Sequence, residues 1–212
     1  MNHLSLFTIL SLLVTILSQS PHSLSEKCNP KDKQALLSIK KAFKNDYYFA
    51  SWEPATDCCD WYIVRCDYTN SRIISLEIFE HNLSGSIPRA VSDLPFLETL
   101  VIHTTNISGP VPSNLSQLKN LKYLRLDQNS LSGSIPPSLA QISSLTSLFL
   151  GHNKLTGALP KGLASLPALR DLDVSYNRLC GRIPTGGIMQ KVDSSSYSNN
   201  KCLCGSPLPN CK

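Results

Sequence analysis

The sequence has little charge, and its only long apolar run lies at the start. Charged residues make up 17 % of the 212 residues and hydrophobic residues 42 %, a balance that excludes an intrinsically disordered chain. The net charge of +5 is a weak electrostatic signal over this length, so we expect no nucleic-acid partner. The length allows one ordinary domain or one elongated array.

No Asp, Glu, Lys or Arg precedes Glu26. The apolar run over residues 4–17 is shorter than the roughly 20 residues of a membrane span, and it fits the core of a secretory signal peptide. Ser23 and Ser25 are small residues ahead of a plausible cut. We therefore predict a signal peptide over 1–25 and a soluble, secreted product without a membrane span; an uncleaved membrane anchor is the alternative.

Eight cysteines form two clusters of four, one near each end. In a secreted chain such clusters indicate disulfides, and we expect no metal or other cofactor; a zinc site in each cluster is the alternative. Adjacent cysteines do not readily pair with each other, and four cysteines allow three connectivities. We favour the pairs Cys28–Cys58, Cys59–Cys66, Cys180–Cys202 and Cys204–Cys211.

The main signal is an internal repeat of 24 residues. Five units begin at positions 73, 97, 121, 145 and 169, in register and without an insertion. The unit that begins at Leu121 shows the pattern of Leu124, Leu126, Asn129, Leu131, Gly133, Ile135 and Pro136.

The geometry of a short strand followed by a turn explains the spacing within a unit. Leu124 and Leu126 point inward from a short strand because strand side chains alternate. Asn129 ends the strand and can bond backbone groups of its own turn and of the adjacent coil, but His81 and Thr105 occupy this position in the first two units. Gly133 allows a positive φ, and a proline stops strand pairing at the back.

One unit cannot bury its apolar side alone, so the units must stack as a solenoid with a lid at each end. Asn29 and Pro30 indicate the start of a helix that would cover the first repeat with its apolar side chains. The unit is identified as a leucine-rich repeat, and its Leu-x-Gly-x-Ile-Pro segment over residues 131–136 resembles the plant-specific form. The resemblance implies an α/β solenoid, a right-handed leucine-rich-repeat superhelix of five plant-type repeats with disulfide-stapled caps. The expected parts are an N-terminal cap over 26–72, repeats over 73–184 and a C-terminal cap over 185–212.

The motifs at both ends narrow the resemblance. The first runs from Cys28-Asn29-Pro30 through Trp52 to Asp57-Cys58-Cys59, and the last contains Cys202-Leu203-Cys204-Gly205. Together with the repeats, they resemble plant polygalacturonase-inhibiting proteins in a shortened form with fewer repeats. The resemblance implies a secreted, non-enzymatic recognition protein of the apoplast or cell wall that inhibits fungal or wall polygalacturonases by steric occlusion in plant defence. The alternative is a soluble receptor-like module that binds a peptide or a receptor ectodomain.

The register identifies the side chains on the concave face of the sheet. Five of the predicted contact residues are acidic and one is arginine, and the aromatic ones favour a protein partner. We expect Phe79, Tyr123, Phe149 and Tyr176 to be the main anchors. The full predicted set is Glu77, Phe79, Glu80, Val101, His103, Tyr123, Arg125, Asp127, Gln128, Phe149, His152, Asp171, Asp173 and Tyr176.

Like-charge repulsion argues against anionic pectin on this acidic face. A weak association with pectin would instead involve a basic N-terminal cap, with Lys27, Lys31, Lys33, Lys40, Lys41 and Lys44. A solvated helix face is the plainer interpretation of these lysines.

Asp171 and Asp173 face the same side of one strand, as a pair of glycosidase carboxylates could, but the face is open. No catalytic constellation stands out, so we predict a binding protein rather than an enzyme. Asn82, Asn106 and Asn114 each begin an acceptor sequence for N-glycosylation, which predicts a glycoprotein.

Overall fold

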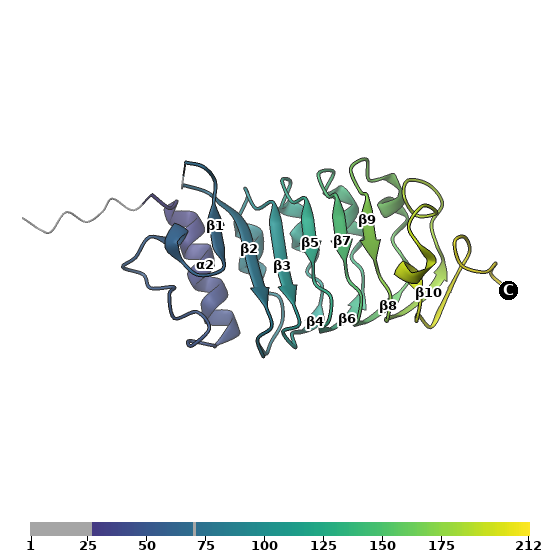
Figure 1. Cartoon of the computed structure of the whole chain (residues 1–212), viewed down its shortest axis with the longest axis horizontal. Coiled ribbons are helices and arrows are strands. Elements are labelled where there is room, and N and C mark those ends of the chain that lie inside the picture. Colours follow the sequence, from purple (N-terminus) through teal and green to yellow (C-terminus); the bar gives the residue numbers. More distant parts are fainter. Residues whose placement is uncertain (1–26, 70) are drawn as a thin grey trace, which may run out of the picture.

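The computed structural model describes residues 27–69 and 71–212; the predicted signal peptide lies outside the described residues. The helix α2 (Pro30–Phe43) stands at one end of an elongated stack of strands, and the C-terminal segment closes the other end (Figure 1). The strands of successive coils lie side by side along the long axis.

The main sheet has the strand order β1-β2-β3-β5-β7-β9. From β2 onward its strands are parallel, and residues 24 apart are neighbours, such as Leu76 beside Leu100 and Leu124 beside Leu148. This confirms the register that the spacing predicts. Only β1 is antiparallel; it lies in the N-terminal cap and has no repeat pattern. The bounds are β1 (Val64–Cys66), β2 (Ile73–Phe79), β3 (Thr99–His103), β5 (Tyr123–Arg125), β7 (Ser147–Phe149) and β9 (Asp171–Asp173).

A second sheet, which the sequence analysis did not predict, follows the order β11-β10-β8-β6-β4. Its strands lie along the lower edge in Figure 1. They are rich in serine and glycine, which are weak strand formers, so propensity did not reveal them. Gly133 in β6 has φ 77°, the positive value that the repeat requires. The bounds are β4 (Ser108–Pro110), β6 (Ser130–Ser134), β8 (Lys154–Gly157), β10 (Arg178–Arg182) and β11 (Cys202–Cys204).

Short 3₁₀ turns complete the coils. Each begins directly after the proline of its repeat, which lies in extended conformation or close to it, and each carries at least one buried apolar side chain. The leucines of both sheets and of these turns form one continuous core. The turns span Arg89–Asp93, Ser113–Gln117, Pro137–Gln141 and Lys161–Ser165.

Buried asparagine amides connect neighbouring coils. The Nδ2 group of Asn153 donates to the carbonyls of Leu126, Leu150 and Gly151 at 3.0–3.1 Å. Its Oδ1 accepts the N–H of Leu131 at 2.9 Å. One side chain therefore satisfies four backbone groups where the main strand has ended, and buried backbone groups need such partners.

This asparagine ladder extends beyond the predicted positions. Asn129 and Asn177 bond in the same way, and Asn200 of the C-terminal segment bonds Val174, Tyr197 and Ser198. Asn200 was missed because it follows Asn177 by 23 residues, outside the 24-residue register.

The two substituted positions of the ladder behave differently. Thr105 is fully buried and donates its hydroxyl to Oδ1 of Asn129 at 3.0 Å, so it belongs to the ladder. His81 is exposed and lies against the ring of Tyr48 instead, so only the first unit lacks an inward-facing member.

The N-terminal lid is joined to the first strand by a buried carboxylate. Helix α2 begins as predicted, with the side chain of Asn29 accepting the N–H of Lys31. Asp32 lies in its first turn with a side chain 1 % exposed, and it accepts two hydrogen bonds from Arg72 and one from the N–H of Ile73. Asp32 thus anchors the helix to β2, a role that the sequence did not reveal.

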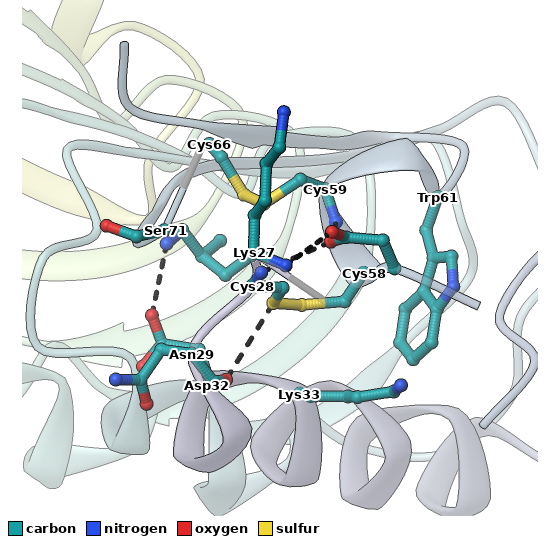
Figure 2. The surroundings of a disulfide bond; sticks show 12 residues. Lys27, Cys28, Asn29, Asp32, Lys33, Cys58, Cys59, Trp61, Cys66 and Ser71 are labelled. Atoms are coloured by element: carbon teal, nitrogen blue, oxygen red, sulfur yellow. Dashed lines mark hydrogen bonds between the residues drawn. A yellow bond between two sulfur atoms is a disulfide. The ribbon is translucent and has the colours of Figure 1, made fainter. Parts of the chain in front are cut away.

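All eight cysteines are paired, and the pairs are those that the sequence analysis favoured. Figure 2 shows the two N-terminal disulfides beside the first turn of α2. Disulfide sulfur is not available as a thiolate ligand, which excludes the zinc alternative for these clusters.

Asp57 secures the start of the described chain. Its carboxylate accepts the N–H groups of Lys27, Cys28 and Cys59 at 2.7, 3.3 and 3.0 Å. Partial burial raises the pKa of Asp57, but these hydrogen bonds outweigh it and hold the pKa below its ordinary value.

We predict that Asn153→Ala destabilises the protein by about 2–4 kcal/mol, because it leaves several buried backbone groups without partners. The measurement is the free energy of unfolding from urea titration. Asn120→Ala is the matched control, because exposed Asn120 donates a single bond to Pro95, and it should cost well under about 1 kcal/mol. An equal loss of unfolding free energy in the two variants would contradict a stabilising role of the asparagine ladder.

We predict that Asp57→Asn lowers the free energy of unfolding by about 1 kcal/mol at pH 7. Because the folded pKa is depressed, this contribution is present above the unfolded pKa of about 4 and is lost as the pH falls through the folded pKa. Wild type and variant should therefore converge in urea titrations as the pH falls below the folded pKa. A constant difference from pH 7 to the acid limit would contradict this account.

Candidate protein-binding face

The concave face is the side of the main sheet that points away from the core. Alternation along each strand decides which side chains reach it, so Leu124 of β5 is buried while Tyr123 and Arg125 are half-buried. The same pattern recurs in β9, where Leu172 is buried between Asp171 and Asp173. The strands therefore bring the predicted set onto one surface.

One edge of this face is set by a repeated turn. The five residues that follow the strands in this turn have φ between 50° and 54°, a left-handed conformation that is uncommon outside glycine. All five are exposed, so the turn directs them to the rim of the concave face. They are Glu80, Thr104, Gln128, His152 and Tyr176.

The predicted aromatic anchors pack against their neighbours across the strands. The rings of Tyr123 and Phe149 are 5.5 Å apart, and those of His152 and Tyr176 are stacked at 4.1 Å. Such contacts restrict the rings before any partner arrives, which lowers the entropic cost of binding.

Charge is distributed unevenly over the concave face. Glu77 lies 3.9 Å from Arg65 of β1, and Asp127 accepts the Nε of Arg125 at 2.8 Å. The hydrogen bond to Asp127 raises the pKa of Arg125 above its ordinary value. Glu77 and Asp127 are therefore paired with cations, whereas Glu80 on the rim forms no ion pair within the described residues.

Near the C-terminal end the carboxylates are not paired. Asp171 accepts the hydroxyl of Ser147 at 2.8 Å, and Asp173 accepts the N–H of Ser175 at 2.8 Å. Within residues 27–69 and 71–212, neither carboxylate forms an ion pair. Two unpaired carboxylates therefore lie together at β9, whereas Glu80 stands alone near β2.

Two members of the predicted contact set offer little surface. Val101 is 7 % exposed, because it lies between Glu77 and Arg125 of the adjacent strands, whose long side chains can cover it. Asp127 is 8 % exposed and is held by Arg125. The other members are half-buried or exposed, and their contact with a partner stays a prediction.

The predicted lysine surface of the N-terminal cap is divided. Lys33 donates its ammonium group to the carbonyl of Thr56, and Lys40 donates to Trp52 and lies 3.7 Å from Glu53. The four other lysines, Lys27, Lys31, Lys41 and Lys44, are exposed. Four of the six lysines therefore remain exposed for a contact with pectin, which stays a prediction.

The first two glycosylation acceptors lie together. Asn82 and Asn106 are exposed, and the amide of Asn106 donates to Oδ1 of Asn82 at 3.2 Å. Asn114 is half-buried and donates to the carbonyl of Arg89. Modification of these residues stays a prediction.

Sequence reasoning missed the residues that flank the face. Arg65 reaches it from the antiparallel strand β1, and Asp193 and Ser195 border it from the C-terminal segment. Both segments lie outside the 24-residue register, so no sequence signal places them beside the sheet.

Comparison with known proteins agrees with this architecture. Residues 29–67 match the leucine rich repeat N-terminal domain, and residues 95–155 and 133–179 match the leucine rich repeat. The BIR2 ectodomain of Arabidopsis thaliana is 32 % identical with a TM-score of 0.78; the match covers 85 % of this chain and 98 % of that one. The chain belongs to the leucine-rich repeat family.

This leucine-rich repeat protein is also similar to polygalacturonase inhibitors. It is 63 % identical over 92 residues to the polygalacturonase inhibitor of Vitis vinifera; these residues are 43 % of this chain and 28 % of the relative. It is 55 % identical over 96 residues to that of Pyrus communis, which is 45 % of this chain and 29 % of the relative. The matched part thus spans less than a third of either relative's length.

The helices of residues 27–69 and 71–212 include none with the length and apolar character needed to cross a membrane.

Proposed function

We propose that this leucine-rich repeat protein is a secreted recognition protein of the plant apoplast or cell wall that binds and inhibits polygalacturonases. The observation that carries the proposal is the concave face, where in-register strands hold Tyr123 and Phe149 and the adjoining rim holds Tyr176 stacked on His152. Aromatic side chains on such a surface are the typical anchors of protein interfaces. The similarity to polygalacturonase inhibitors supports the class of partner.

The proposed mechanism is steric occlusion. A partner enzyme seated across the concave face would have its substrate cleft covered, and the inhibitor would contribute no chemical step. The four disulfides support an oxidising, extracellular setting. Glycans on Asn82 and Asn106 would lie on neighbouring coils.

A second candidate is a soluble module that binds a peptide or a receptor ectodomain. It is favoured by the match to the BIR2 ectodomain, which extends over nearly all of that chain. The two candidates differ in a single readout, because only the first lowers the activity of a polygalacturonase.

We also propose a weak association with pectin, on a different surface from the one the lysine pattern favoured. Lys154 of β8 and Arg178 and Arg182 of β10 are exposed on the second sheet. The five strands of this sheet contain no acidic residue, and the three cations form no ion pair within residues 27–69 and 71–212. Opposite charge would hold an anionic polysaccharide here while the acidic concave face stays free.

The test of the first proposal is an activity assay of fungal polygalacturonases with the purified protein added. Wild type should inhibit, and Tyr123→Ala combined with Phe149→Ala should raise the inhibition constant at least about tenfold, because two central anchors are removed. Tyr68→Ala is the matched control, since Tyr68 is 98 % exposed on the N-terminal cap. No inhibition by the wild type, or equal inhibition by all three proteins, would contradict the proposal.

The test of pectin association is retention on immobilised polygalacturonate at several salt concentrations. Arg178→Gln with Arg182→Gln should elute at clearly lower salt than wild type, because the variant loses two electrostatic contacts with the carboxylates of the polysaccharide. Lys31→Gln with Lys41→Gln removes the same charge from the N-terminal cap and should elute close to wild type. A larger loss in the lysine variant would return the site to the cap.

A further inference from the structure

A pocket of about 520 Å³ lies where the concave face meets the C-terminal segment. Its walls come from β7, β9, the rim at Tyr176 and residues 192–198. The C-terminal segment follows the last coil closely, because the N–H groups of Val174 and Tyr176 donate to the carbonyls of Ser196 and Ser198 at 2.9 and 3.0 Å. It therefore takes the place of a further strand beside β9 (Figure 1).

The hollow exists because this segment presents small side chains. It forms a 3₁₀ turn (Ser194–Tyr197) in which Tyr197 points into the core, fully buried, and its hydroxyl donates to the carbonyl of Met189. Ser195, Ser196 and Ser198 line the pocket, and their side chains are short. The outward space beside β9 is thus left unfilled.

Three carboxylates line this pocket, those of Asp171, Asp173 and Asp193. None of them forms an ion pair within the part of the chain that the structure describes. Hydrogen bonds from Ser195 to Asp193 lower the pKa of that carboxyl, so it is ionised at neutral pH. Arg170 is the single cation among the lining residues. The pocket is therefore anionic, whereas Glu77 and Asp127 elsewhere on the face are paired with cations.

A polar group at the floor has no partner. Ser175 is 5 % exposed and lines the pocket, and the described residues offer its hydroxyl no hydrogen bond. Among the described residues the hydroxyl oxygen of Ser175 is not one of the fully buried polar atoms, so solvent in the pocket reaches it, and a ligand can replace that solvent with a donor of its own.

Gly151 gives the neighbouring carboxylate its room. A Cβ at Gly151 would approach Oδ2 of Asp173 to 2.7 Å, closer than the two atoms can lie. The absence of a side chain at this position keeps Asp173 in its place in the pocket wall.

The aromatic residues complete the site. Phe149 and Tyr176 line the pocket from β7 and from the rim, and Tyr176 is held in place by stacking on His152. A flat ring attracts a cation over its face. The pocket therefore offers carboxylates, a hydroxyl oxygen that can accept a hydrogen bond, and aromatic rings. These groups are complementary to a planar cation that carries several N–H donors.

We propose that this pocket binds an arginine side chain of the protein partner. A guanidinium group presents five N–H donors in a plane, so it can bond two carboxylates and the Ser175 hydroxyl at once and lie against a ring. The proposal rests on the proposed function for the identity of the partner, but the pocket itself needs no polygalacturonase. In this contact, a basic side chain of the partner enters the C-terminal end of the concave face.

The test uses the whole secreted protein labelled with ¹⁵N and a short probe peptide, acetyl-Gly-Arg-Gly amide. Titration should shift the amide resonances of residues 171–176 and 193–198. The same peptide with citrulline, which is neutral and nearly isosteric, should bind roughly tenfold more weakly. Shifts at other residues, or equal binding of the citrulline peptide, would overturn the proposal.

Two variants separate charge from hydrogen bonding. Asp171→Asn with Asp173→Asn keeps the size of both side chains and should weaken arginine binding roughly tenfold, whereas Ser175→Ala should weaken it about threefold. Asp46→Asn, which removes an exposed carboxylate from the N-terminal cap, should leave it unchanged. Unchanged binding in the double variant would reject the site.

The outcome is independent of the inhibition assay. Arginine binding without inhibition of any polygalacturonase would keep the pocket and remove the proposed function. Inhibition without a shift in the pocket would keep the function and remove the pocket.

Discussion

The structure depends on the sharing of backbone hydrogen bonds between coils that cannot be stable alone. A single coil leaves its leucines half covered and its turn carbonyls without partners. The next coil supplies both, through the leucine register and through asparagines such as Asn153, whose amide spans two coils. The backbone groups of the first and last coils also need hydrogen-bond partners. Asp32 and Asn200, which lie outside the repeat, bond to Ile73 and Val174 there.

The regularity of the core determines the character of the surface. Because the strands are held in register, side chains such as Tyr123 and Phe149 stand at fixed separations with little freedom left to lose. Charge then varies along an otherwise uniform face. Arg65 and Arg125 pair with Glu77 and Asp127, whereas Asp171 and Asp173 lie together without a cation partner among the described residues. The two ends of the face therefore differ in charge.

Much of the architecture follows from periodicity. The strand register and the positive φ at Gly133 were predictable, because each depends on contacts within one coil or at its fixed interval. The helix start at Asn29 was predictable from local capping, and the favoured cysteine pairs join cysteines of the same cluster. The second sheet was not, since serine and glycine carry no strand signal. The contacts of Lys33 with Thr56 and of Lys40 with Trp52 were not predictable either, because they depend on how the cap folds back on itself.

The sequence by itself determined which side chains point inward and which share the concave face, because alternation and a constant repeat length are properties of the chain. Only the tertiary structure decided where charges cancel and where space remains. The pocket beside β9 joins residues from the repeat with Asp193 and Ser195 from a segment without the repeat. Contacts between a periodic and a non-periodic segment have no signature in sequence spacing, so they emerge only when both are folded together.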